Sequence, residues 1–322
     1  MATSRIAAVI LAAGKGTRLK SDLPKVLHEV CGRPMLAYVF DACRAAGVQD
    51  CLAVVGHGKD LVIEAFAGEN GITWIEQSPQ LGTGHAVMVC RDSLKQYDHV
   101  LVLCGDGPLV RTETIQALID KHLSERNTAT LATSVLDNPT GYGRIWRDDD
   151  GQFLGIVEHG DCTDEQRQIR EVNPSYYCFA VPALLGALDR IKPHNVKKEY
   201  YITDCLGLFL ADGGKVDALT AVEPEDIYSI NARKHLAQVN DVMRRRTLDR
   251  LMSNGVTIVD PASTWIDARA EVGRDTIIEP GVQIRGAARI GSDCRIGPYA
   301  VLTGSVEIAD HTRVGPFTGG SA

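Results

Sequence analysis

A glycine-rich loop with clustered basic side chains follows the first apolar run of the sequence. Residues 6–11 lead into GKGTR at 14–18, and Lys25 comes directly after Pro24. Glycines let backbone N–H groups close on phosphate oxygens, while Arg18 offers a planar, permanently charged donor fork. The glycines alone would fit an ordinary strand-to-helix turn, but the added cations favour phosphate binding. The spacing is neither a Walker loop nor GxGxxG, so the residues predict phosphate binding without naming a class.

The elements that must hold this loop follow an α/β pattern. From residue 5 to about 135, short apolar runs alternate with amphipathic segments. This alternation predicts a doubly wound, mostly parallel, Rossmann-like sheet with helices on both faces. Ligands of such sheets bind beyond the carboxyl ends of the strands. Because GKGTR and LCGDGPL at 103–109 both fall at such ends, we expect them to line one cleft.

The last part of the chain has a six-residue period. Residues 233–255 have apolar positions at helical spacing and predict a connecting helix, whose three arginines at 244–246 we expect on a solvated face. Apolar residues then recur every sixth position: Ile266, Val272, Ile278, Ile284, Ile290, Ile296, Leu302, Ile308 and Val314. The period predicts a short left-handed parallel β-helix of hexapeptide repeats. We expect this short solenoid to pack against a partner subunit, and by analogy with other left-handed β-helices we expect a homotrimer.

These patterns predict three segments: an α/β domain with a phosphate-binding loop over 1–232, the connecting helix over 233–255, and the β-helix over 256–322. Composition narrows the partners. The net charge is -7, which disfavours nucleic acid and anionic membranes as partners and makes any phosphate binding local. Nine cysteines without a CxxC pair fit a reducing cytoplasm, and no apolar stretch is long enough to span a membrane. The apolar run after Arg5 is too short for a signal peptide and leads straight into GKGTR.

A family resemblance rests on several motifs in order. LAAGKGTRLKSDLPKVLHEVCGRPML at 11–36 resembles the signature of enzymes that make nucleoside diphosphate sugars. It is most similar to the N-acetylglucosamine-1-phosphate uridylyltransferases, the pyrophosphorylase part of the bifunctional GlmU family. The spacing of Arg18 and Lys25, AAG in place of GG, and QLGTGHA at 80–86 separate it from glucose-1-phosphate and mannose-1-phosphate enzymes. GDGPL, PTGYGRI, EHGDCTDEQRQI, EYYITD and the hexapeptides extend the match over essentially the whole chain.

The resemblance implies that UMP passes from UTP to N-acetylglucosamine-1-phosphate, with Mg²⁺ as cofactor, in the synthesis of a cell-wall precursor. Such a transfer requires in-line positioning and charge neutralisation. By the match, Arg18, Lys25 and Asp106 are catalytic, and Asp106 and Asn231 hold the metal, although an Asp at a strand end can equally cap a helix. The nucleotide-side positions are Leu11, Ala12, Gly14, Lys25, Gln77, Gln80, Gly82 and Thr83. The sugar-side positions are Gly143, Glu158, Asn173, Tyr201 and Thr203.

Departures from the family pattern fall on the sugar side. Pro174 and Ser175 stand where Thr-Gly is usual after Asn173, Gly160 stands in place of a Lys, and Gly107 in place of a Val or Ala. A uridylyltransferase for another sugar, of galactosamine or glucose type, therefore stays open, as does a non-catalytic nucleotide-sugar sensor. A histidine-based acyltransferase or carbonic-anhydrase-like trimer is disfavoured because His311 is the only histidine in the repeats. Because the hexapeptide run is short, we also expect no acetyltransferase activity.

Overall fold

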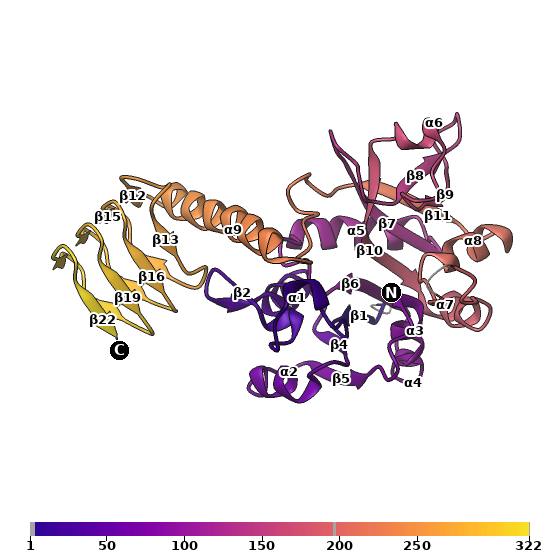
Figure 1. Cartoon of the computed structure of the whole chain (residues 1–322), viewed down its shortest axis with the longest axis horizontal. Coiled ribbons are helices and arrows are strands. Elements are labelled where there is room, and N and C mark those ends of the chain that lie inside the picture. The colour runs from indigo at the N-terminus through magenta and orange to yellow at the C-terminus, as the bar shows by residue number, and fades with distance from the viewer. Residues whose placement is uncertain (1–3, 196–197, 322) are drawn as a thin grey trace. The chain divides into compact units, whose positions relative to one another are not determined.

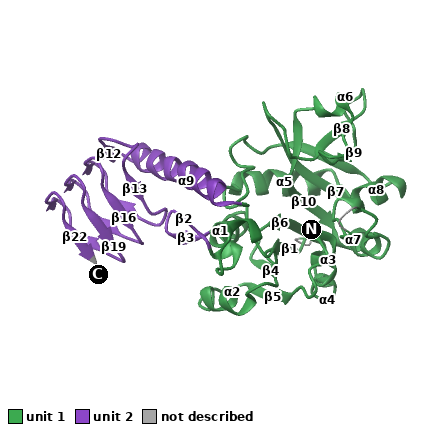
Figure 2. Cartoon of the chain, viewed as in Figure 1, with its two compact units in different colours: residues 1–27, 35–231 green, residues 28–34, 232–322 purple. Residues whose placement is uncertain are grey.

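The computed structural model describes residues 4–195 and 198–321. It divides into two compact units, one of residues 1–27 and 35–231 and the other of residues 28–34 and 232–322 (Figures 1 and 2). The sequence placed residues 28–34 within the first segment, whereas the structure groups them with the second unit. The chain therefore passes between the units three times, after Leu27, after Pro34 and after Asn231.

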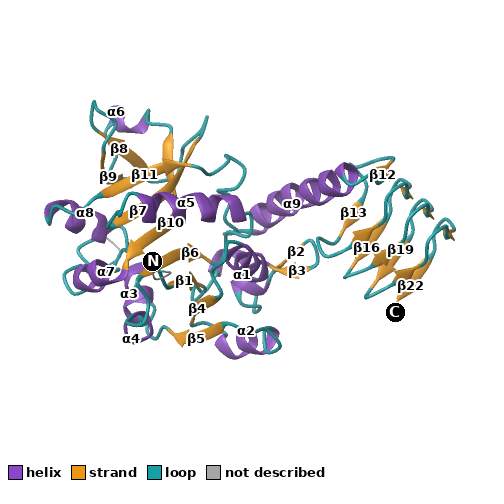
Figure 3. Ribbon diagram, turned by 180° about the vertical axis from the view of Figure 1, so that it is seen from behind, coloured by secondary structure: helices purple, strands orange, loops and turns teal. Residues whose placement is uncertain are grey.

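The first unit is built on a nine-stranded mixed sheet (Figure 3). Its main path has the order β11-β7-β10-β6-β1-β4-β5, and β8 and β9 form a hairpin that joins β10. All neighbours on the main path are parallel except β10, which runs antiparallel to both β6 and β7. The strands are β1 Ile6–Leu11, β4 Asp50–Val55, β5 Ile72–Glu76, β6 His99–Cys104, β7 Ala129–Val135, β8 Arg144–Arg147, β9 Phe153–Val157, β10 Glu171–Ala180 and β11 Val216–Thr220. The predicted mostly parallel α/β sheet is confirmed.

Helices cover this sheet. They are η1 Thr17–Leu19, η2 Lys25–Leu27, α1 Met35–Ala45, α2 Lys59–Ala65, α3 Thr83–Met88, α4 Arg91–Leu94, α5 Thr112–Ser124, α6 Asp164–Arg167, α7 Val181–Leu188 and α8 Asp204–Ala211. α1 packs beside α5, while α3 and α8 both pack beside α7. Residues 7–10 of β1 have no exposed surface, which is the pattern of a parallel strand buried on both faces. The centre of the sheet is thus a dry, rigid base for the loops at its carboxyl edge.

The second unit joins one long helix to a column of short strands. The predicted connecting helix is α9, Arg233–Ser253. After it come three parallel sheets, ordered β12-β15-β18-β21, β13-β16-β19-β22 and β14-β17-β20. Their strands are β12 Thr257–Ile258, β13 Trp265–Ile266, β14 Glu271–Val272, β15 Ile277–Ile278, β16 Gln283–Arg285, β17 Arg289–Ile290, β18 Arg295–Ile296, β19 Val301–Thr303, β20 Glu307–Ile308, β21 Arg313–Val314 and β22 Gly319–Ser321.

Register follows the six-residue period of the sequence. Ile266 pairs with Ile284 and Ile284 with Leu302, so each coil of three hexads stacks like on like. These residues form an apolar core inside the coils, in which their exposed fractions do not exceed 3%. The predicted hexapeptide β-helix is therefore confirmed. The second unit also contains the small hairpin of β2 (Glu29–Val30) and β3 (Arg33–Pro34).

Two further structural facts concern membrane-spanning helices and cysteines. Within the described residues, no helix combines the length and the apolar character needed to cross a membrane. All nine cysteines are free thiols, and seven of them are buried.

Candidate active site

A pocket of about 450 Å³ lies at the carboxyl edge of the sheet in the first unit. Leu11 at the end of β1 and Cys104 at the end of β6 both line it, so the two loops that follow these strands share one cleft. All eight positions predicted for the nucleotide side line this pocket: Leu11, Ala12, Gly14, Lys25, Gln77, Gln80, Gly82 and Thr83. Asp106 lines it as well.

The two glycines of the opening loop have different structural roles. Gly16 has a φ of 61°, and a Cβ there would lie 2.8 Å from the Cβ of Lys25. Only glycine fits this turn, which presses the loop against the stem of Lys25. Gly14, by contrast, would meet nothing within 4 Å if it carried a Cβ. Its missing side chain leaves open space beside the backbone, as close approach of a phosphate requires.

Lys25 joins the predicted catalytic groups. Its ammonium donates hydrogen bonds to the Asp106 carboxylate and, at 2.8 Å, to Asn231 Oδ1. Arg18 donates to the same Asn231 oxygen at 2.9 Å. Ile230 N–H donates to the Asp106 carbonyl at 3.0 Å, and this bond holds the segment that carries Asn231 beside the end of β6. Four residues far apart in the sequence therefore form one polar cluster.

The oxygen atoms in this cluster suit a hard divalent cation. Asp106 and Asn231 each direct a side-chain oxygen at the same ammonium, so two oxygen ligands converge on a position that already holds positive charge. Among the described residues, no group of three or more His, Cys, Asp or Glu side chains could hold a metal ion. Mg²⁺ needs no such cage, because it keeps several waters and is usually bound by one or two protein oxygens plus substrate phosphates. The residues present therefore fit Mg²⁺ bound jointly with a phosphorylated substrate.

Main-chain hydrogen bonds between two segments close one side of the pocket. Tyr200 N–H donates to the Leu81 carbonyl at 2.8 Å, and Gly84 N–H donates to the Tyr200 carbonyl at 2.7 Å. A Cβ at Gly82 would lie 2.5 Å from that Tyr200 carbonyl, so the close approach requires glycine. The Thr83 hydroxyl accepts from Ile202 N–H at 3.1 Å. This pairing brings Glu199 into the pocket wall.

The Gln77 side chain holds the same turn by hydrogen bonding. Its side chain is 5% exposed, and its amide nitrogen donates to the Gly82 carbonyl at 2.9 Å and lies 3.1 Å from His85 Nδ1. The amide nitrogen is thus occupied within the protein. Any reading of a base by Gln77 would use its other amide atom or the backbone.

A second cavity of about 270 Å³ adjoins the first, because Cys104 and Asp106 line both. Three of the five predicted sugar-side positions line it: Gly143, Glu158 and Asn173. Tyr201 and Thr203 do not belong to its lining. The charges of Glu199 and Glu158 do reach Tyr201, since they add to burial in raising the pKa of its phenol.

Pro174 lies where β10 departs from regular pairing. The register between β10 and β7 shifts between Val172 and Tyr176, so the intervening residues are released from the ladder. Ser175 has a φ of 68°, and its N–H donates to Asn173 Oδ1 at 3.0 Å. Proline is tolerated in a strand at such a bulge, because no ladder hydrogen bond is lost there. The bulge orients Asn173, which also donates to the Tyr177 hydroxyl at 2.7 Å.

Cys104 lies between the two cavities but is not a nucleophile. Burial, with a further contribution from the Asp106 charge, raises the pKa of its thiol to about 12. The neutral thiol is a poor nucleophile and a poor metal ligand. The arrangement therefore provides charge and oxygen ligands at the junction of the cavities, and the thiol there is not activated for covalent catalysis.

Sequence reasoning did not single out several residues of the cavity walls. They are Lys15, Thr17 and Glu199 in the larger cavity, and Tyr142, Tyr176, Ile227 and Ser229 in the smaller one. Lys15, Thr17, Tyr142 and Glu199 lie inside the quoted motifs, so the motifs point to loops that line these cavities. Ile227 and Ser229 carry no local signal except their nearness to Asn231 in the sequence.

The fold and the cluster agree with a family match. Residues 8–192 match the model of the MobA-like NTP transferase domain, and residues 269–304 and 287–319 match bacterial transferase hexapeptide repeats. The chain belongs to the MobA-like NTP transferase domain family and is an enzyme of the nucleotidyltransferase class.

Individual relatives are more specific. The chain is 45% identical over 283 residues to the bifunctional protein GlmU of Alkaliphilus metalliredigens, which covers 88% of this chain and 62% of the relative. It is 45% identical over 280 residues to the bifunctional protein GlmU of Geobacillus thermodenitrificans, covering 87% and 61%. The resemblance to the GlmU family stated from the sequence is thus confirmed. The chain spans about three fifths of the length of these relatives.

Solved structures agree on the fold. One, of a UDP-glucose pyrophosphorylase complexed with UDP-glucose, has a TM-score of 0.63 at 16% identity and covers 76% of this chain and 100% of the other. Another, described as a glucose-1-phosphate thymidylyltransferase of Bacillus anthracis, has a TM-score of 0.61 at 19% identity, covering 74% and 94%. At these identities the likeness establishes the architecture of the first unit alone.

Proposed function

We propose that this chain transfers UMP from UTP to N-acetylglucosamine-1-phosphate and releases pyrophosphate, with Mg²⁺ as its cofactor. The observation that supports this most directly is the position of the cluster of Arg18, Lys25, Asp106 and Asn231. Asp106 faces two adjoining cavities, one suited to a nucleotide and one to a smaller phosphorylated partner. A protein that only binds a nucleotide sugar would need neither residues shared between two cavities nor the full set of phosphate-binding and metal-binding groups.

The reaction needs no enzyme nucleophile. A phosphate oxygen of the sugar 1-phosphate forms the new bond to the α-phosphorus of UTP, and the bond from that phosphorus to the bridging oxygen of pyrophosphate breaks. Lys25 and Arg18 neutralise charge on the α-phosphate and the departing pyrophosphate, and backbone N–H groups of residues 14–16 bind phosphate oxygens. Asp106 and Asn231 would hold the metal, which when bound adds charge stabilisation and orients the phosphates. The chain's own residues thus orient two substrates and balance charge.

A second candidate is the same transfer to a different sugar 1-phosphate. The observation that favours it is Gly107, which lines the smaller cavity. Its φ is not positive, and a Cβ there would meet only Cys104 O and Tyr176 Oη, both at the ordinary contact distance of 3.7 Å. Neither the backbone nor packing requires glycine at this position. The missing side chain therefore leaves room that a larger or differently substituted sugar could fill.

Pyrophosphate release from UTP and Mg²⁺ across a panel of sugar 1-phosphates tests the function and names the sugar. We expect the highest kcat/KM with N-acetylglucosamine-1-phosphate. Asp106→Ala should lower kcat at least about 100-fold, because it removes a ligand for the charge that develops in the transition state. Asp120→Ala, at an exposed position on α5, is the matched control and should change kcat less than twofold. An unchanged rate for Asp106→Ala would contradict the metal assignment, and an inactive wild-type chain would contradict the function.

A further inference from the structure

Two of the reactive groups lie beside points where the chain passes between the units. Lys25 belongs to η2, Lys25–Leu27, and the very next residue, His28, begins the segment that belongs to the second unit. Asn231 is the last residue of the first unit before α9. Two residues therefore separate Lys25 from chain that the second unit holds, and Asn231 lies immediately before such chain.

The segment after Lys25 is a tight hairpin. β2 and β3 pair through Glu29–Pro34 and Val30–Arg33, which leaves Cys31 and Gly32 as the two-residue loop. Both loop residues have positive φ, 45° and 84°, as a type I′ turn requires. This conformation is unfavourable for a non-glycine residue such as Cys31 and persists only where neighbouring groups hold it.

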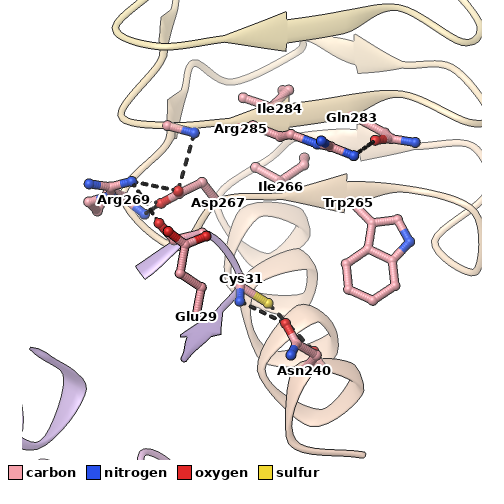
Figure 4. Close-up of a pocket in the computed structure, with 12 residues that line it drawn as sticks. Glu29, Cys31, Asn240, Trp265, Ile266, Asp267, Arg269, Gln283, Ile284 and Arg285 are labelled. Carbon is pink, nitrogen blue, oxygen red and sulfur yellow. Dashed lines mark hydrogen bonds and ion pairs between the residues drawn. The ribbon is translucent and has the colours of Figure 1, made fainter. Parts of the chain in front are cut away.

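Asn240 of α9 holds the strained residue. Its Oδ1 accepts from Cys31 N–H at 2.8 Å, and its carbonyl accepts from the Cys31 thiol at 3.5 Å (Figure 4). Burial, together with the charge of Asp267, raises the pKa of that thiol to about 12, so it stays protonated and remains a donor. The Asn240 amide nitrogen donates to the Leu236 carbonyl at 2.9 Å, which fixes the side chain against its own helix.

The first coil holds the other side of the turn. Arg269 donates to both oxygens of the buried Asp267 at 2.9 and 2.7 Å, and to the Gly32 carbonyl at 3.3 Å (Figure 4). A Cβ at Gly32 would lie 2.4 Å from Asp267 Oδ2, so the turn touches the carboxylate directly. A pocket of about 540 Å³ remains between the hairpin, α9 and the strands β13 and β16. Polar contacts, rather than continuous packing, therefore hold the hairpin tip in place.

We infer that Asn240, Asp267 and Arg269 form a clamp on the hairpin of residues 28–34 that positions Lys25, which makes Asn240 a positioning residue for the transfer reaction. The catalytic part of this inference rests on the proposed function. The ammonium of Lys25 must meet Asp106, Asn231 and a substrate phosphate at once. Only Val26 and Leu27 separate Lys25 from the hairpin segment, which begins at His28. Release of the hairpin therefore allows the Lys25 side chain more positions.

Hydrogen exchange tests the mechanical step without any catalysis. In Asn240→Ala, we expect faster amide exchange in peptides that cover residues 28–34 and also in those that cover 16–27. Gly32→Ala, which displaces the turn from Asp267, should have the same effect from the opposite side of the clamp. Gln238→Ala removes an exposed amide from the same helix and should leave both peptides unchanged. Faster exchange confined to 28–34 would overturn the inference.

Steady-state kinetics test the catalytic step. We expect Asn240→Ala to lower kcat about 10-fold, since a small misplacement of a reacting group costs one to two orders of magnitude. Its thermal midpoint should stay close to that of the Gln238→Ala control. Asn240→Asp keeps an acceptor oxygen for Cys31 N–H but loses the donor to the Leu236 carbonyl, so its kcat should lie between those of Asn240→Ala and the wild type.

A double mutant separates positioning from a general loss of structure. If Asn240 acts through Lys25, then Asn240→Ala should lower kcat little further in a Lys25→Ala background. Full additivity of the two losses would overturn the positioning role, as would an unchanged kcat in Asn240→Ala. An inactive wild-type chain would count against the proposed function alone, because the exchange result still decides whether the clamp orders residues 16–27.

Discussion

At the residue scale, the charged and polar groups of the cluster are bonded to one another, and a bound substrate could replace these partners. Lys25 binds the Asp106 and Asn231 oxygens, and Arg18 shares the Asn231 oxygen. A triphosphate with its metal would offer the cations new anionic partners and the oxygens a new cation. On the proposed function, both sets of groups lie close to where a bound triphosphate and its metal would need them, which would limit reorganisation at the moment of reaction.

Gly107 provides a prediction about sugar selection. Gly107→Val should raise KM about 10-fold for any larger sugar 1-phosphate that the wild type accepts, because the new side chain, which is usual at this position in the family, fills room in the smaller cavity. The KM for UTP should change less than twofold. Gly155→Val is a suitable control, since Gly155 also has open space around its Cα but does not line the cavity. Equal increases in KM for the sugar 1-phosphate and for UTP would show that the substitution disturbs the fold and does not act on sugar selection.

Individual site residues were predictable where their role depends on local sequence. Gly16 and Lys25 lie in one continuous motif, and their mutual packing follows from it. Glu199 was missed, because its place in the pocket depends on main-chain pairing with residues 81–84, more than a hundred positions earlier. The bulge at Pro174 was invisible for a similar reason, since it is defined by the register with β7.

At the element scale, the antiparallel strand β10 shapes the smaller cavity. It lies between β6 and β7, which places its bulge beside the end of β6, where Cys104 begins the loop to Asp106. The alternation of apolar runs predicted the parallel strands and the loops at their ends. It could not predict strand order, because order is set by contacts between elements distant in the sequence.

The packing of α5 on the sheet gives a pH-dependent prediction. His122 of α5 is fully buried, with Nδ1 3.1 Å from Thr130 Oγ1 and Nε2 3.0 Å from His99 Nδ1. Burial, assisted by His99, lowers the pKa of His122 from 6.5 to about 4. Between these values the unfolded chain binds the proton and the folded chain does not, so stability falls as the pH falls.

The size of this effect can be measured by denaturant unfolding at pH 7 and pH 5. The free energy of unfolding should fall by about 2 kcal/mol more in the wild type than in His122→Gln, which keeps polar atoms but does not titrate. His57→Gln, at an exposed position, should retain the wild-type dependence. The same pH dependence in His122→Gln as in the wild type would mean that His122 is not the group responsible.

At the scale of the whole molecule, the β-helix could be predicted from the sequence but the full extent of the second unit could not. The β-helix was fully visible in the sequence, because each coil repeats the same inward positions and pairs with its copy 18 residues later. Assignment of residues 28–34 to the second unit was not visible, because two-residue strands carry no periodicity and their place depends on α9 and the first coil. A continuous motif in sequence can thus be divided between two folding units.

The short β-helix leads to a prediction about assembly. Its outer surface carries large exposed rings: Trp265 is 40% exposed, and Tyr299 and Phe317, which stack with centroids 5.5 Å apart, are 56% and 76% exposed. Exposed apolar groups on a parallel β-helix favour burial against other copies of the chain. We therefore expect light scattering coupled to size exclusion to give three times the chain mass of 34.9 kDa at micromolar concentration. A single species at the mass of one chain, unchanged over a hundredfold range of concentration, would show that the coils are stable without a partner and would remove the basis for a trimer.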